Sequence, residues 1–547
     1  MNRTRTARAA VLLVVVLLAG LYVGAGGMSR QTFAADAFAE CAVQVSNDFA
    51  FKLYAQLAKN NLKENLFFSP YSLSTVLAMT AEGARGQTAM EMGEVLCLPE
   101  AARGKGGDAK DMPWKLGQIH NGFFKIDQYL NARKDVAADP TVLAEAAKVR
   151  KEFNALRAQV SRLRKDERWD EYAKAVVLAR QTAEKLQKLL STVNLYELRI
   201  ANAIWGQRTY PFVDSYLSTI DRYYKTGGVF PADFETNYPA ERVRINKWVE
   251  DKTAGRITDL IPDLPPAEAR FIRLILTNAI YFKGEWFVQF DKAWTDNRGF
   301  HLAGGGTAKT PIMRLWDMDV GRYGAFNADG SLFATPVMIR RGQTTGLYPD
   351  DKGFAMAELP YDAGSLSMVI LAPNAPDGLA ALEQKLTAAK VSILVGRLRN
   401  RPFHVLLPKF RLETGYDMNE TLQAMGMVRA FTPPTRPNGA DLTGMRASKD
   451  PGKRFYIDKI MHKAFVEVNE KGTEAAAATG GGLFDGGDEP EATLFVPSFQ
   501  ADRPFLFFIR DIKSGLILFM GRMTDPTSAA SAPPPAVAPA TAPAPEA

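Results

Sequence analysis

The side chains that most often perform catalysis are few and scattered in this chain. Four widely spaced histidines, none in an H-x-x-x-H pair or a cysteine cluster, are His120, His301, His404 and His462. A zinc site therefore has no support. There is no G-x-S-x-G turn or dinucleotide-binding glycine pattern, and Ala308 stands where a phosphate-binding loop needs its second glycine before Lys309 and Thr310. We expect no catalytic residue, no metal and no cofactor, and hence not an enzyme.

The segment after His462 suggests a different kind of chemistry. Residues 464–468 alternate like a strand, and residues 469–472 have the composition of a turn or hinge. Thr473, Glu474 and four alanines then precede Thr479. One interpretation is a short surface helix, but the ten residues after Thr479 include five glycines, which would not continue a helix. The other is a movable strand, since small side chains would not obstruct its entry into a sheet.

The surrounding elements mix helical and strand patterns. Residues 46–57 and 72–79 have the periodicity of amphipathic helices. Apolar runs predict strands at residues 275–281, 367–371, 403–407 and 505–509. Because regular helical crossovers do not separate these strands, an α+β architecture is favoured over a doubly wound sheet. The composition, 46% hydrophobic and 23% charged over 547 residues, is that of a globular protein.

One long stretch has a purely helical pattern. Apolar residues recur in steps of three and four over residues 142–163 and 172–193, with a charged break at 165–168. This predicts an antiparallel coiled-coil hairpin within residues 133–193, with arms about 33 Å long at about 1.5 Å per residue. Between Arg133 and Leu190 there are 14 Lys/Arg and 9 Asp/Glu, so the stretch carries +5 of the total charge of +7. That charge suits either a solvated outer face or a contact surface for a polyanion or protein partner.

The two ends of the chain carry targeting and low-complexity signals. Three arginines precede an apolar run over residues 9–25, and cleavage motifs follow at 23–25 and 37–39. We expect residues 1–39 to be a signal peptide, or alternatively a membrane anchor, and the folded part to be secreted, extracellular or periplasmic. Residues 528–547, nearly all Ala, Pro and Ser, are expected to be a disordered tail after a domain at 40–527. Cys41 and Cys97 could pair or remain buried thiols.

Separated motifs in a fixed order run from about residue 45 to residue 526, outside the helical stretch. They lie at residues 65–72, 201–205, 245–257, 277–286, 407–410, 501–505 and 518–522, and Thr-Asn-Ala-Ile-Tyr-Phe-Lys-Gly-Glu-Trp at 277–286 is the most specific. In these motifs the chain resembles a serpin, a member of a family of serine and cysteine protease inhibitors. The resemblance implies a fold of three β-sheets, about nine helices and an exposed reactive loop, here with the helical hairpin inserted.

The resemblance also implies a mechanism and its residues. In inhibitory serpins a protease attacks the reactive loop and forms an acyl-enzyme, and the cleaved loop then inserts into the main sheet as a strand. The implied hinge of this loop is Glu470, Gly472, Thr473, Glu474, Ala475, Ala476, Ala477 and Ala478. The implied polar "shutter" under the sheet comprises Ser69, Ser72, Asn278 and His462. The implied "breach", where insertion begins, comprises Trp286 and Glu470.

The position of the scissile bond depends on the direction of counting. The family interval of about fifteen residues from Gly472 leads to Gly486 and spans about 50 Å at about 3.3 Å per residue. Counting back from Phe499 gives Pro490 or Glu491 instead, so the loop is longer than usual. We prefer the forward count, because inserted length determines how far the protease is carried. The resulting reactive-site window is Phe484, Asp485, Gly486 and Gly487.

Two functions remain open at this point. The first is a protease inhibitor that acts as a suicide substrate, with a serine or cysteine protease as its covalent partner. The alternative is a non-inhibitory serpin that binds a polyanion or protein through the basic helical stretch. In either case we expect a monomer and no nucleic-acid partner.

Overall fold

The computed structural model describes most of the chain between residues 36 and 528. The described ranges are 36–60, 63–104, 111–131, 139–166, 168–190, 196–225, 227–318, 320–340, 343–362, 364–473 and 492–528. The predicted signal segment up to residue 35, the hinge residues 474–478, the reactive-site window and the tail from residue 529 lie outside these ranges.

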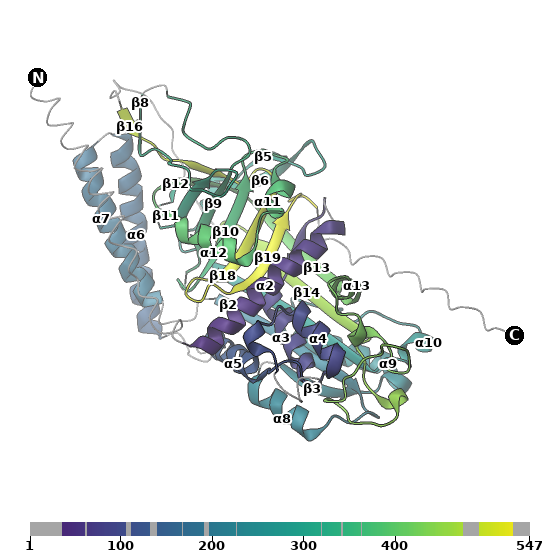
Figure 1. Cartoon of the computed structure of the whole chain (residues 1–547). Helices are drawn as coiled ribbons and strands as arrows, with labels where there is room; N and C mark the ends of the chain where they lie inside the picture. Colours follow the sequence, from purple (N-terminus) through teal and green to yellow (C-terminus); the bar gives the residue numbers. More distant parts are fainter. Residues whose placement is uncertain are drawn as a thin grey trace, which may run out of the picture.

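Helices pack around β-sheets in an α+β architecture (Figure 1). The buried helix α3 (Pro70–Glu82) begins where the sequence supplies a cap, because the Ser69 side chain accepts a hydrogen bond from the Ser72 N–H and Pro70 occupies the first turn. The predicted helices at 46–57 and 72–79 are confirmed within α2 and α3. The remaining helices outside the predicted hairpin are α2 (Ala37–Asn60), α4 (Gly86–Val95), α5 (Gly117–Asn131), α8 (Asp214–Tyr223), α9 (Phe234–Lys252), α10 (Pro266–Ala269), α11 (Leu379–Glu383), α12 (Ala388–Arg397) and α13 (Asn419–Ala424).

The sheet that contains the predicted hinge, called the main sheet below, has six strands. Their order is β13 (Phe410–Asp417), β14 (Lys459–Val468), β15 (Gly472–Thr473), β4 (Leu274–Glu285), β2 (Tyr196–Gln207) and β3 (Gly227–Ala232). One face is covered by α9, whose Ile245 and Val249 share an apolar cluster with Trp205 and Ala279. Since side chains alternate along a strand, the neighbouring residue Asn278 faces the other side, toward α3.

The centre of this sheet has an unusual junction. Strands β14 and β4 run parallel and pair directly from Lys459↔Ile275 to Phe465↔Tyr281. Beyond that point the short strand β15 lies between them, antiparallel to both, with the pairs Val468↔Thr473 and Gly472↔Glu285. The pairing of β14 with β4 thus closes the sheet below β15.

Two further sheets and a ribbon complete the described strands. One sheet has the order β1 (Leu66–Phe68), β19 (Ile517–Met523), β18 (Phe505–Asp511), β10 (Leu366–Pro373), β9 (Phe354–Pro360), β7 (Arg322–Phe326) and β11 (Arg399–Asn400). The other has the order β17 (Ser498–Gln500), β12 (Phe403–Pro408), β6 (Thr307–Met318) and β5 (Asp296–His301). The ribbon pairs β16 (Ala492–Leu494) with β8 (Met338–Arg340). All four predicted strands are confirmed, in β4, β10, β12 and β18.

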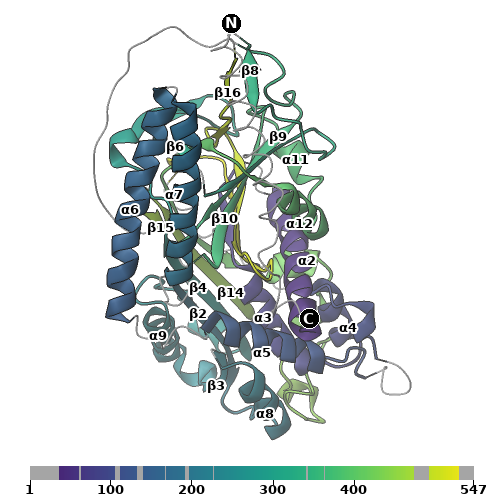
Figure 2. The ribbon, with the colours of Figure 1, turned by 90° about the vertical axis from the view of Figure 1, so that its left-hand side faces the viewer.

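Helices α6 (Pro140–Lys165) and α7 (Trp169–Leu190) lie side by side along one flank of the molecule (Figures 1 and 2). At one end of the pair, Val149, Phe153 and Leu186 belong to the main core, whereas toward the other end Leu163 and Tyr172 belong to a small separate cluster. That the pair is an insertion into the serpin fold and a coiled coil stays a prediction. Including α6 and α7, the described residues form twelve α-helices, whereas the resemblance implied about nine. Short helices such as α10 are part of the difference.

The first described helix includes one of the two candidate cleavage motifs. Residues 37–39 form the first turn of α2, where Ala39 is buried and Asp36 accepts a hydrogen bond from the Phe38 N–H. Nearby, Cys41 and Cys97 are free thiols, and burial raises the pKa of both. Among the helices described, none combines the length and apolar character needed to cross a membrane.

Candidate functional site

The predicted hinge enters the main sheet as β15. The backbone of Gly472 and Thr473 pairs with Glu285 and Gly284 of β4. A Cβ atom on Gly472 would lie 2.2 Å from the Gly284 carbonyl oxygen and 2.5 Å from the Glu285 Cα. Both obstacles are backbone atoms, which cannot rotate away as a side chain could, so only glycine fits at this point of entry.

The predicted breach residues hold the hinge in place. Trp286 is buried; its backbone N–H donates to the Lys471 carbonyl (2.7 Å) and its indole Nε1–H donates to the Asn469 carbonyl (3.0 Å). Its ring stacks on Tyr361 with centroids 4.6 Å apart. The breach thus fixes the two carbonyl groups that flank Glu470.

Glu470 itself is anchored by charge. Its Oε2 lies 3.0 Å from the Lys409 Nζ. Burial alone would raise the pKa of this carboxyl, but backbone hydrogen bonding and Lys409 outweigh burial and hold the pKa below its ordinary value. Glu470 is therefore ionised and paired at the start of the hinge.

The predicted shutter residues meet in one buried hydrogen-bond network below β15. Asn278 Nδ2 donates to Ser72 Oγ (2.8 Å), and the His462 ring bonds to the Asn278 carbonyl oxygen. The Ser69 backbone N–H donates to His462 Nε2 (3.1 Å), while Ser69 Oγ donates to the Leu518 carbonyl (2.7 Å). The network thus links α3 to β4 and β14, the two strands that close the sheet.

The network fixes the state of His462. Accepting a hydrogen bond from a backbone N–H requires a bare Nε2, so the proton of the neutral ring is on Nδ1 and points to Asn278. Burial lowers the pKa of His462 to about 3, opposed by its hydrogen bond to Asn278. His462 is thus neutral and hydrogen-bonded through both ring nitrogens.

Asn202 is a shutter member whose role the sequence did not reveal. Its Oδ1 accepts from Ser72 Oγ (2.8 Å) and from Asn278 Nδ2 (2.6 Å). Asn202 on β2 stands directly opposite Asn278 on β4. The register of β2 against β4 would have identified the pair, but that register is not readable from either motif alone.

Helix α6 contacts residues next to the breach. Arg150 Nη2 lies 2.6 Å from Asp362 Oδ1, and Nη1 donates to the Phe287 carbonyl (3.1 Å). The Asp362 N–H donates to the Glu285 carbonyl, in the residue that pairs with Gly472. Burial raises the pKa of Asp362 to about 6, although Arg150 opposes the rise. A short series of bonds therefore connects α6 with the hinge.

The downstream side of the predicted loop is attached at a second place. Backbone pairs join Ala492 to Arg340 and Leu494 to Met338 in the β16–β8 ribbon. The Phe495 N–H donates to the Val337 carbonyl (2.8 Å), and Arg401 Nη2 donates to the Phe495 carbonyl (3.2 Å). Residues 474–491 therefore connect two described anchors, β15 and β16.

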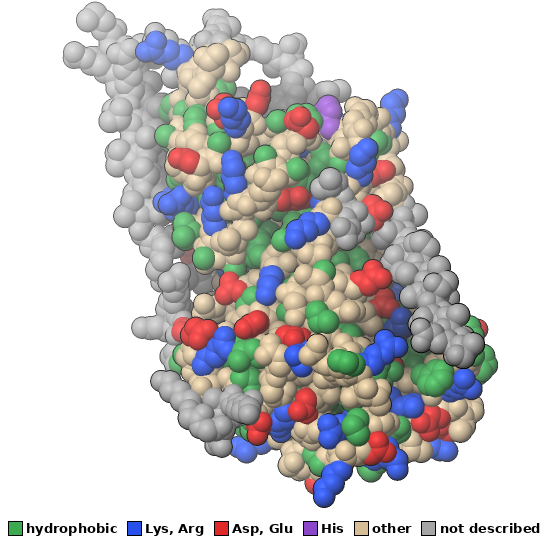
Figure 3. Space-filling model, turned by 45° about the vertical axis from the view of Figure 1, so that its right-hand side comes forward, with side chains coloured by type: hydrophobic (Ala, Val, Ile, Leu, Met, Phe, Trp, Pro, Cys, Tyr) green, Lys and Arg blue, Asp and Glu red, His purple; other side chains and the backbone are tan. Residues whose placement is uncertain are grey.

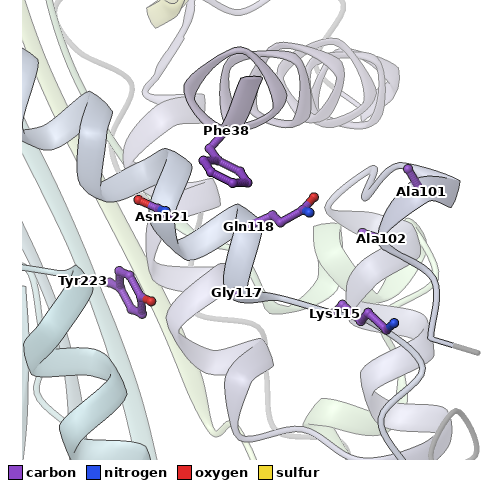
Figure 4. Close-up of a pocket in the computed structure, with 8 residues that line it drawn as sticks. All are labelled: Phe38, Ala101, Ala102, Lys115, Gly117, Gln118, Asn121 and Tyr223. Carbon is purple, nitrogen blue, oxygen red and sulfur yellow. The ribbon is translucent and has the colours of Figure 1, made fainter. Parts of the chain in front are cut away.

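Beyond the hinge, breach and shutter, the described residues contain a hollow but no cluster of metal ligands. No three His, Cys, Asp or Glu side chains in the described ranges gather as metal ligands would. A hollow of about 380 Å³ lies elsewhere, and none of its lining residues belongs to the hinge, breach or shutter: Phe38, Ala101, Ala102, Lys115, Gly117, Gln118, Asn121 and Tyr223 (Figure 4). On the face drawn in Figure 3, positive and negative side chains are interspersed rather than gathered by sign.

Comparison with known proteins identifies the architecture. The chain is 33% identical over 487 residues to an uncharacterized serpin-like protein of Thermococcus kodakarensis, covering 88% of this chain and 85% of that protein. It is 31% identical to human Serpin B3, covering 88% of this chain and 99% of the relative.

Solved structures agree on the fold. Human thyroxine-binding globulin, solved in complex with thyroxine, matches with a TM-score of 0.61 at 23% identity, covering 90% of this chain and all of that one. Native protease nexin-1 with heparin matches with a TM-score of 0.61 at 20% identity, covering 89% of this chain and all of that one. The family described as "Serpin (serine protease inhibitor)" matches residues 44–526, and the chain therefore belongs to the serpin family.

Proposed function

We propose that this serpin is an exported inhibitor that traps a serine or cysteine protease as a covalent acyl-enzyme. The observation that carries the proposal is the seating of Gly472 and Thr473 between the parallel strands β14 and β4. A strand that has entered the sheet by two residues can be extended by the residues that follow it. These are Glu474 and four alanines, and the alanine side chains are small enough for a buried position in a sheet.

The closed part of the sheet provides the barrier that such a mechanism needs. Insertion must separate β14 from β4 and break the shutter contact between His462 and Asn278. Until the loop is cut, its far end is attached at β16, which opposes further entry. Cleavage within Phe484, Asp485, Gly486 or Gly487 would release the upstream end for insertion. The downstream attachment at residues 492–494 also accounts for the extra loop residues, which favours the forward count from Gly472.

The proposal is tested by incubating the protein with a panel of serine and cysteine proteases and running a denaturing gel. We expect a band at the summed mass that survives boiling, and mass spectrometry of the released fragment to place the cut in the reactive-site window. Thr473→Arg should convert the inhibitor into a substrate, because a charge would have to enter the sheet. Cleavage by every protease without any stable band, and without a rise in thermal stability, would refute inhibition.

The second candidate function is binding through the α6–α7 pair. The serpin fold does carry ligands, since thyroxine-binding globulin was solved with thyroxine and protease nexin-1 with heparin. In this chain the excess positive charge lies on and beside the α6–α7 pair. Retention on a sulfated-polymer column, with a steep dependence on salt, would support a polyanion partner. Equal retention of a variant lacking the exposed lysines Lys151, Lys174 and Lys185 would refute it.

Export is also a proposal. Cleavage after residue 39 would remove Asp36, which pairs with Lys125 and accepts from the Phe38 N–H at the start of α2. Cleavage after residue 25 would spare both contacts. We therefore favour the first motif, and N-terminal sequencing of the exported protein would distinguish the two.

A further inference from the structure

A row of exposed and half-buried rings lies beside the downstream anchor of the reactive loop. On β6, the Trp316 ring packs on the His404 ring of β12 with centroids 4.7 Å apart. His404 stands opposite Ser498 of β17, whose backbone N–H donates to the Tyr348 hydroxyl (3.0 Å). The Tyr348 ring in turn contacts the Phe495 ring at 5.7 Å.

These side chains remain accessible although they are apolar. Trp316 is 39% exposed, Tyr348 41% and Val337 44%, and the Val337 carbonyl accepts from the Phe495 N–H. Single exposed apolar residues are ordinary. Here, however, three of them lie around the chain that leaves the loop: Trp316 packs on His404 opposite Ser498, Tyr348 contacts Phe495, and Val337 bonds to Phe495. We call Trp316, Val337 and Tyr348 the loop-side patch.

Arg401 joins the two chain segments beside the patch. Arg401 donates to the carbonyls of Thr335 (3.3 Å), Pro336 (3.0 Å) and Phe495 (3.2 Å), which binds the segment before β8 to the segment after β16. One end of α6 reaches the same region. Arg164 of that helix is close enough for its positive charge to add to burial in lowering the pKa of His404 to about 4. In Figure 1 the β8–β16 ribbon and one end of the α6–α7 pair lie at the same end of the molecule.

We propose that the loop-side patch is a second docking surface for the body of the protease that attacks the reactive loop. The inference rests on the proposed function and deepens it, since it gives the target protease a contact outside the scissile segment. The partner it fits is a protease with an apolar or aromatic rim on the side of its cleft that binds residues downstream of the cut.

The short distance along the chain between the reactive-site window and β16 favours a protease as the partner of the patch. A chain spans at most about 3.6 Å per residue, so Gly487 lies no farther than about 18 Å from Ala492 in β16. A protease domain of about 230 residues has a radius of gyration of about 17 Å, which corresponds to a sphere of about 22 Å radius. A protease that grips the reactive-site window is therefore held within about one protease radius of β16, and the rim of its cleft can reach the ribbon.

The chemistry of the patch suits such a contact. Protease–inhibitor interfaces bury about 800 Å² on each partner, more than a few extended residues can supply. Tryptophan and tyrosine are the side chains that most often dominate binding at interfaces. An apolar contact beside the loop would raise the rate of productive encounter without changing the chemistry of the cut.

The test compares two matched variants of the full chain. Trp316→Ser/Val337→Ser removes two side chains of the patch. The control Val243→Ser/Phe271→Ser removes two more exposed apolar side chains, one on α9 and one just after α10, elements at the other end of the molecule. The reagent is the protease of the panel that reacts fastest with the parent. We expect the patch variant to react about tenfold more slowly and the control within twofold, with equal unfolding temperatures and unchanged complex per cleavage.

Two outcomes separate this inference from the proposed function. Rates within twofold of the parent for the patch variant would overturn the docking surface even where the covalent complex forms normally. Where no complex forms with any protease, inhibition is refuted, and kcat/KM for loop cleavage then tests the patch by the same tenfold criterion.

Discussion

The two attachment points of the predicted reactive loop differ in almost every physical respect. The upstream one, β15, is in the middle of a six-stranded sheet, and Gly472 is buried against backbone atoms of β4. The downstream one, β16, belongs to a two-stranded ribbon whose neighbours are exposed apolar side chains. At β15 the backbone of the hinge fits against the backbone of β4. At β16, Arg401 and the backbone hydrogen bonds to β8 hold a strand at the surface.

This difference indicates which end can move. Below β15 the sheet is closed by one strand pair, so a continuing strand has neighbours waiting on both sides. In the described part of the chain, β16 pairs with β8 and with no other strand, so it has no slot to extend into. Under the proposed mechanism, the upstream anchor would be the starting point for insertion and the downstream anchor a fixed support.

The largest expected effect comes from breaking the upstream anchor. Gly472→Ala places a methyl group 2.2 Å from the Gly284 oxygen and should expel β15 from the sheet. Overpacking of this kind costs roughly 1–3 kcal/mol, so we expect the yield of covalent complex per cleavage to fall roughly tenfold. The control is Gly415→Ala on β13, where no atom lies within 4 Å of the added Cβ. An unchanged yield in Gly472→Ala would contradict the role of β15.

An intermediate effect is expected from acid acting on the closed sheet below β15. The pKa of His462 is about 3 in the folded protein, so the unfolded chain, with a pKa near 6.5, binds the proton first as pH falls. Stability should drop by roughly 2 kcal/mol between pH 6.5 and pH 4.5 because of this group alone. Urea unfolding at the two pH values would measure it, and His462→Gln should remove that part of the slope whereas His301→Gln should keep it. Identical slopes in all three proteins would exclude His462 as the cause.

The smallest effect is expected at the downstream anchor. Arg401→Gln removes hydrogen bonds to three backbone carbonyls and should loosen the ribbon by about 1 kcal/mol. Amide exchange at Phe495 should accelerate about fivefold, while the complex yield changes less than twofold. If the yield instead fell as far as in Gly472→Ala, the two anchors would be equally involved in insertion and the contrast between them would be lost.

The position of the upstream anchor could be predicted from the sequence, whereas the pairing at the downstream anchor could not. Ser69, Asn278 and His462 were named because their motifs resemble those of the family, and the structure joins them in one hydrogen-bond network. Asn202 needed the register of two strands far apart in sequence. The contact of Arg150 with Asp362 joins residues 212 apart and depends on where α6 docks.

The β8–β16 ribbon shows the limit most clearly. Each strand has only three residues, too few for an alternating pattern to be recognised. The disagreement between the forward and backward counts was the one sequence signal of its presence. It indicated extra residues in the loop without indicating that some of them are paired.

The direction of β15 has one further consequence. Its two neighbours run parallel to each other, and β15 runs opposite to both. A strand that continued along this path would replace one parallel seam with two antiparallel ones, and antiparallel ladders are slightly the more stable per residue. The uncut sheet therefore contains fewer and weaker interstrand bonds than its own strand polarities permit. Under the proposed mechanism, the polarities of β14, β15 and β4 would thus supply part of the free energy of insertion.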